Sequence, residues 1–95
     1  MSKSPVDKRY NRFGTLLRSY REVKGISRKA LAATVGYAGS CTIHALETAQ
    51  SFSRRPTLPT IIEVAHALGL NKHDLVLLVL ASLEDRIEEA GYEFD

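Results

Sequence analysis

The sequence contains one cysteine, Cys41, no tryptophan, and few aromatic residues, which make up 7% of the chain. A single cysteine forms no disulfide within the chain, so a reducing compartment such as the cytoplasm is the expected location. No run of about 18 apolar residues is present, which argues against a membrane-spanning helix. Residues 1–5 lead into charged residues rather than an apolar segment, and no export signal is therefore expected.

Charge is distributed unevenly along the 95 residues, although the formal net charge is only +2. Residues 1–60 carry 11 Lys and Arg against three Asp and Glu, a balance of +8, whereas residues 61–95 carry two against eight, a balance of −6. The basic part favours a polyanionic partner such as a nucleic acid, with a solvated basic surface as the alternative. The apolar fraction of 44% is typical of a globular protein, and the length fits one small domain.

Apolar residues recur at helical spacing along the chain, and no stretch alternates as a strand would. Five helices are expected, over about residues 12–24, 28–35, 40–48, 58–68 and 72–90. Ser27, Thr57 and Asn71 are expected to cap the second, fourth and fifth helices, and Gly36 to end the second. The inward-facing residues expected on the second and fourth helices are Ala30, Leu31, Thr34, Val35, Leu58, Ile61, Ile62, Ala65 and Leu68.

The sequence therefore predicts an all-α fold. Residues 1–9 are expected to form a loose basic arm, residues 10–70 the helical domain, and residues 71–95 a separate C-terminal helix.

Five short segments also follow one another in an order known from one protein family. They are GISRKALAA (25–33), VG (35–36), IHALE (43–47), PTL (56–58) and VAHALGL (64–70). Over about residues 12–75, the chain resembles the helix-turn-helix domain of the phage-repressor (XRE-type) DNA-binding family. This resemblance implies a five-helix, lambda-repressor-like domain whose third helix enters the major groove of DNA. The segment 37–39 makes the turn one residue longer than the family pattern, and Ala49 stands at the usual glycine position.

The resemblance also implies roles for individual residues. Arg21 and Glu47 match a family pair that links the first and third helices through an ion pair. The residues implied to read base edges are Ser40, Cys41, Thr42, His44 and Ala45. The cations implied to contact phosphates, or otherwise to be solvated surface charges, are Arg28, Lys29, Arg54 and Arg55.

The expected C-terminal helix carries more apolar surface than one small core can cover. Residues 75–81, LVLLVLA, are apolar on every face of a helix, so a surplus face is expected to bind a partner. The expected interface residues are Leu75, Val76, Leu78, Val79, Leu80 and Leu83. Two partners remain open: a second copy, giving a homodimer suited to a two-fold operator, or a different protein such as a toxin neutralised by an antitoxin.

Catalytic chemistry has little support in the sequence. Cys41 and His44 are two potential ligands, too few for a structural zinc site, and no nucleophile motif or phosphate-binding glycine loop is present. No enzymatic activity, cofactor or metal is therefore expected. The expected function is that of a sequence-specific, homodimeric transcriptional repressor, with an antitoxin or adaptor as the alternative.

Overall fold

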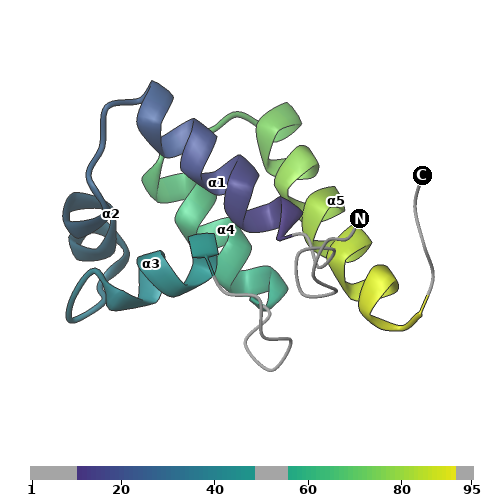
Figure 1. Ribbon diagram of the computed structural model, residues 1–95. Coiled ribbons are helices and arrows are strands. Elements are labelled where there is room, and N and C mark those ends of the chain that lie inside the picture. Colours follow the sequence, from purple (N-terminus) through teal and green to yellow (C-terminus); the bar gives the residue numbers. More distant parts are fainter. Residues whose placement is uncertain (1–10, 49–55, 92–95) are drawn as a thin grey trace, which may run out of the picture.

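The computed structural model describes residues 11–48 and 56–91, and every regular element within these ranges is a helix (Figure 1). The expected all-α fold of five helices is confirmed. The helices are α1 (Arg12–Val23), α2 (Arg28–Val35), α3 (Cys41–Thr48), α4 (Leu58–Ala67) and α5 (Lys72–Glu89). The expected basic arm, Arg54 and Arg55 lie outside the described residues. In the described ranges, no helix is long and apolar enough to cross a membrane.

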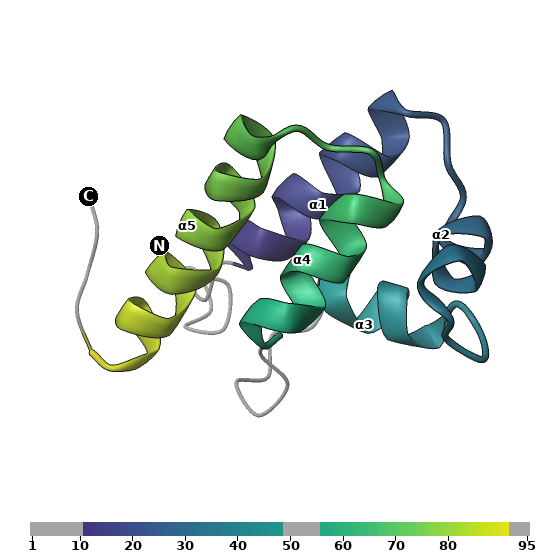
Figure 2. The same cartoon turned by 180° about the vertical axis from the view of Figure 1, so that it is seen from behind.

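The helices surround a single core, to which all five contribute. α1 packs against α3 and α5, while α4 packs against α2 and α5, as the two opposite views show (Figures 1 and 2). The largest apolar side chains with less than 3% of their surface exposed are Phe13, Leu17, Leu31, Ile43, Ile61, Val64 and Leu78. Because Leu78 of α5 belongs to this core, α5 packs as part of the same unit as α1–α4.

Helix boundaries follow the capping residues that the sequence contains. The side chains of Ser27, Thr57 and Asn71 each accept a hydrogen bond from the backbone N–H three residues further on, at 3.0, 3.4 and 2.8 Å. Gly36 ends α2 with a φ of 104°, a conformation that residues with a Cβ rarely adopt. These four expected caps are confirmed.

On α2 and α4, some of the residues that the sequence predicts to face the core are exposed instead. Ala30 and Thr34 of α2 are exposed, because a helix of two turns presents only one face to its neighbours α3 and α4. On α4, Leu58 and Ile62 are 51% and 45% exposed, and Val64 is fully buried instead. This helix is apolar on several sides, so its periodicity alone does not select the inward face.

A buried carboxylate of α5 fixes the start of α1. Asp85 is 1% exposed, and its two oxygens accept hydrogen bonds from the backbone N–H groups of Arg12 and Phe13, at 3.0 and 3.1 Å. These N–H groups have no partner within their own helix, and a negative charge also suits the positive end of the helix dipole. The Arg12 side chain in turn reaches Glu88 at 2.9 Å, and this hydrogen bond raises the pKa of the guanidinium.

The hydrogen bonds between Asp85 and the start of α1 also fix which face of α5 points into the core. Leu78, two turns before Asp85 on the same face, is completely buried in the core of its own chain. The prediction that Leu78 lies at an interface with a partner is therefore wrong. Leu75 and Val79 are half-buried at the edges of this face, whereas the remaining expected interface residues, Val76, Leu80 and Leu83, are exposed.

Candidate nucleic-acid interface

The first turn of α3 exposes one side to the surroundings. The helix begins after Ser40, whose backbone carbonyl accepts a hydrogen bond from the N–H of His44 at 2.9 Å. Ile43 and Glu47 turn inward, which leaves the other side of α3 open. The structure thereby brings the five expected base-reading residues together: Ser40 is half-buried, and the exposed ones are Cys41, Thr42, His44 and Ala45.

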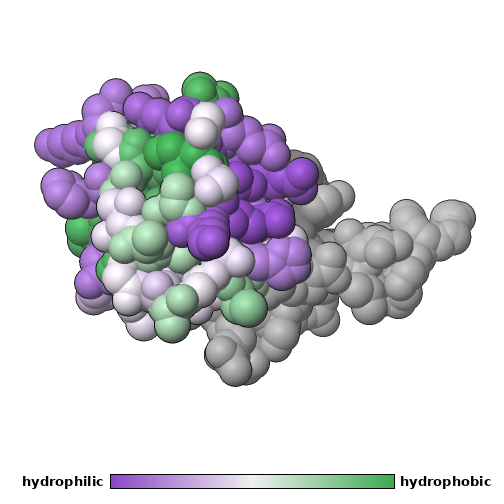
Figure 3. Space-filling view, turned by 90° about the vertical axis from the view of Figure 1, so that its left-hand side faces the viewer, coloured by the Kyte–Doolittle hydropathy of each residue, from purple (hydrophilic) through white to green (hydrophobic). Residues whose placement is uncertain are grey.

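The surface on this side of the molecule is mixed. Figure 3 looks onto the α2 side, where a strongly apolar green area and paler surface below it are bordered by hydrophilic side chains in purple. Cys41, Thr42, Ala45 and Leu46 line an open hollow of about 450 Å³ beside α3.

The last turn of α3, in contrast, is held tightly against the first turn of α1. Asn11 accepts a hydrogen bond from the N–H of Gly14 at 2.9 Å and donates one from Nδ2 to the carbonyl oxygen of Leu46 at 3.1 Å. A Cβ at Gly14 would lie 2.6 Å from that same oxygen and even closer to the carbonyl oxygen of Glu47. The two helices therefore touch through backbone atoms, which requires glycine at this position. Neither residue is among those expected from the sequence: the cap that Asn11 forms is a local signal that was missed, whereas the contacts of both residues with α3 have no local signal.

We expect the substitution Gly14→Ala to lower the free energy of unfolding by about 1–3 kcal/mol, since the added methyl group displaces backbone rather than a flexible side chain. Gly39→Ala is the matched control, because a Cβ there meets no atom within 4 Å. Urea unfolding followed by circular dichroism measures both. Equal, small losses for the two variants would contradict the close approach of α1 and α3.

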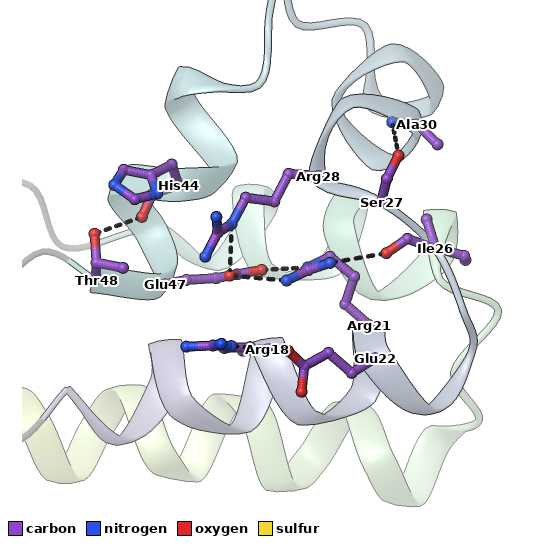
Figure 4. A network of polar contacts seen from close by, with 10 residues as sticks. All are labelled: Arg18, Arg21, Glu22, Ile26, Ser27, Arg28, Ala30, His44, Glu47 and Thr48. Carbon is purple, nitrogen blue, oxygen red and sulfur yellow. Dashed lines mark hydrogen bonds and ion pairs between the residues drawn. The ribbon is translucent and has the colours of Figure 1, made fainter.

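A buried carboxylate with two arginine partners links α1, α2 and α3 (Figure 4). Glu47 of α3 has no exposed side-chain surface, and its Oε2 accepts a hydrogen bond from Nε of Arg21 at 2.6 Å. Arg21 also donates from Nη2 to Oε1 of Glu47 at 3.3 Å and from Nη1 to the carbonyl oxygen of Ile26 at 2.9 Å. The structure thus contains the ion pair between α1 and α3 that the family resemblance implies.

Arg28, the first residue of α2, is the second partner of Glu47. Its Nε donates to Oε1 of Glu47 at 3.0 Å, and its side chain is 32% exposed. Its two Nη groups make no hydrogen bond or ion pair within the described part of the chain. Two cations share one anion here, so the cluster of Arg21, Arg28 and Glu47 carries a formal charge of +1. From the sequence, Arg28 is expected only as a phosphate-binding or solvated cation; its contact with Glu47 was not predicted.

The other cations of this region differ in whether a nearby carboxylate balances their charge. Lys29, next to Arg28, is exposed on α2. Arg18 of α1 donates from Nε to Glu22 at 2.9 Å and thereby lowers the pKa of that carboxyl group. The charge of Arg18 is therefore largely balanced within α1. Arg28, beside the last turn of α3, and the exposed Lys29 therefore keep more uncompensated charge than Arg18.

Comparison of the chain with family models, with curated proteins and with solved structures finds no match. Within residues 11–48 and 56–91, no group of three or more His, Cys, Asp or Glu side chains is placed to hold a metal ion.

The exposed side of α3 offers hydroxyl and imidazole groups, and the neighbouring helix α2 offers two cations, Arg28 and Lys29. Such groups form hydrogen bonds and ion pairs with an anionic partner.

Proposed function

We propose that this protein binds double-stranded DNA through α3 and acts as a sequence-specific transcriptional repressor. The observation that carries this proposal is that α3 is fixed to its neighbouring helices at its last turn and exposed at its first. Its last turn is fixed to α1 and α2 through Asn11, Gly14 and the Glu47 cluster, whereas the outer side of its first turn exposes short side chains. A helix that reads base edges in the major groove needs such a rigid support and such a free end.

The exposed residues of α3 suit several base edges. The hydroxyl groups of Ser40 and Thr42 and the imidazole of His44 donate or accept hydrogen bonds, and Ala45 offers a methyl group to thymine. None of the implied base-reading residues is Arg, Asn or Gln, the side chains that form bidentate pairs with a purine. The shape of the DNA is therefore expected to contribute to specificity besides direct contacts.

Arg28 and Lys29 are proposed to contact the phosphate backbone, Arg28 through the Nη groups that Glu47 leaves free. Each phosphate contact releases a condensed counterion, so the logarithm of affinity falls linearly with the logarithm of salt concentration by about 0.9 per contact. We expect Arg28→Ala to weaken binding to all sequences alike and to reduce this slope by about one. Binding isotherms on duplex DNA at several salt concentrations measure the slope.

Two further variants test whether the slope depends on a positive charge at position 28 in particular. Arg28→Lys keeps the charge and should retain most of the slope, although it loses the hydrogen bond from Nε. Lys24→Ala removes one exposed cation at the C-cap of α1, a residue that the proposal does not assign to DNA, so it should leave the slope unchanged. Binding of wild-type protein that does not depend on salt, or no binding to any duplex, would contradict the proposed function.

The alternative function is that of an antitoxin or adaptor that uses its C-terminal helix to bind another protein. The observation that favours it is the apolar surface left exposed on α5. A gene for a small toxin next to the gene for this chain would support the alternative, whereas an isolated or phage-borne gene would support the repressor.

A further inference from the structure

The exposed side of α3 is centred on a methyl group. Ile43 and Glu47 face the core, and Ala45 lies on the opposite side of the helix from both, since each residue turns the helix by about 100°. Cys41 lies about 40° to one side of Ala45 and Thr42 about 60° to the other. All three side chains are exposed. The surface that α3 turns outward here therefore consists of short side chains with few polar atoms.

The hollow beside this surface has a mainly apolar lining. Among the described residues, its walls are Cys41, Thr42, Ala45 and Leu46, and its volume is about 450 Å³. Leu46 is half-buried and packs against the core, so it is a fixed apolar wall. A free cysteine such as Cys41 behaves as a small hydrophobic residue with a weak S–H donor. The hydroxyl of Thr42 is thus the one strong hydrogen-bonding group among these four side chains.

Base edges in the major groove differ in how well they suit such a hollow. Guanine presents two acceptors, adenine an acceptor and a donor, and cytosine a donor amino group. Burying these groups against apolar side chains without hydrogen-bond partners costs free energy. Thymine presents a C5-methyl group beside the acceptor O4, and 5-methylcytosine carries the same methyl group beside its amino group. A C5-methylated pyrimidine therefore fits the hollow best.

The charges on the neighbouring helix favour DNA over an apolar protein segment as the occupant. α2 packs against α3 and carries Arg28 and the exposed Lys29. Arg28 shares the single carboxylate of Glu47 with Arg21, which leaves one positive charge of this cluster uncompensated. Uncompensated cations attract a polyanion, whereas an apolar segment gains nothing from them.

We infer that this hollow recognises the C5-methyl group of a pyrimidine, in thymine or 5-methylcytosine, through contacts with Cys41, Ala45 and Leu46. The hydroxyl of Thr42 can donate to O4 of thymine or accept from the amino group of 5-methylcytosine. The inference rests on the proposed function and deepens it, because it names the chemical group that α3 recognises.

Uracil substitution tests this inference, because uracil differs from thymine only in lacking the C5-methyl group. The probe is the duplex that the wild type enriches most from a random pool, and each of its thymines is replaced by uracil in turn. We expect about fourfold weaker binding at one or more thymines, the effect of one buried methyl group, and no change at the others.

A second set of duplexes distinguishes the two sources of the methyl group. The sensitive thymine–adenine pair is replaced by a cytosine–guanine pair, with and without a methyl group on the cytosine. About fourfold tighter binding of the methylated duplex would support recognition of the methyl group in either base. Equal binding of the two would assign the hollow to thymine. A selected duplex that contains no thymine, or whose thymines are all replaced without loss, would overturn the inference.

The variant Ala45→Ser connects the effect to the hollow. It keeps the side chain small but adds a hydroxyl group, so it should remove the preference for thymine over uracil. This preference is a ratio of two affinities of the same protein, and a change in folding stability therefore cancels. Ala33→Ser, at an exposed residue of α2 that does not line the hollow, should keep the wild-type ratio.

The failure of this inference differs from the failure of the proposed function. A wild type that enriches a specific duplex but binds its uracil form equally well would overturn methyl recognition and leave DNA binding intact. An Ala45→Ser variant that keeps the full preference would also overturn the assignment to this hollow. A wild type that enriches no duplex would overturn the proposed function itself.

Discussion

Replacing Glu47 with alanine should lower the free energy of unfolding by about 3–5 kcal/mol, because it leaves a buried guanidinium without its anion. Arg21 is 9% exposed, and without Glu47 its one remaining hydrogen-bond partner among residues 11–48 and 56–91 is the carbonyl oxygen of Ile26. Arg28 would lose its anion at the same time. The junction of α1, α2 and α3 depends on this carboxylate. Urea unfolding at neutral pH measures the loss.

Two comparisons make this prediction specific. Arg28→Ala should cost less, because Arg21 then still donates two hydrogen bonds to Glu47 and the Arg28 side chain is one-third exposed. Glu22→Ala removes an exposed carboxylate whose partner, Arg18, is exposed as well, so it should cost less than about 1 kcal/mol. Equal losses for Glu47→Ala and Glu22→Ala would show that the cluster does not hold the junction together.

The substitution Leu80→Asp should reduce operator affinity by about 10²–10⁴-fold while leaving nonspecific affinity nearly unchanged. Leu80 is 48% exposed on α5, where the sequence predicts pairing with a second copy, and a carboxylate there would have to lose its water on such pairing. The resulting monomers keep their phosphate contacts but bind each half-site separately. Sedimentation and a footprinting titration on the same variant measure the two effects.

Val23→Asp serves as the matched control, because it introduces the same charge at an exposed apolar residue of α1. It should leave both the assembly and the operator affinity unchanged. If Leu80→Asp protein is monomeric and yet binds its operator as tightly as the wild type, then the two half-sites are not linked through α5.

Much of the fold follows from local sequence signals. Ser27, Thr57, Asn71 and Gly36 bound their helices as expected, since capping depends on residues within one turn of the helix end. The inward faces were harder to predict for helices that are apolar on several sides. Leu78 is buried and Ile62 is exposed because the packing of neighbouring helices, rather than periodicity, selects the face.

The residues that position the candidate site were predicted only in part. The resemblance implied the pairing of Arg21 with Glu47, but the contact of Arg28 with the same carboxylate has no local signal. Asp85 is likewise one of several acids in its segment, and only its position opposite the start of α1 distinguishes it. Partners separated by 19 to 73 residues are brought together by the tertiary fold, which local patterns do not encode.

Selection of bound duplexes from a pool of random sequence is the most direct test of the proposal that α3 reads DNA. For the wild type, we expect enrichment of an inverted repeat whose half-sites lie ~10 bp apart between centres, one duplex turn. The same selection with Thr42→Ala or His44→Ala should enrich an altered half-site, because both side chains are exposed at the free end of α3. A pool that remains random after repeated rounds with the wild type would contradict sequence-specific DNA binding.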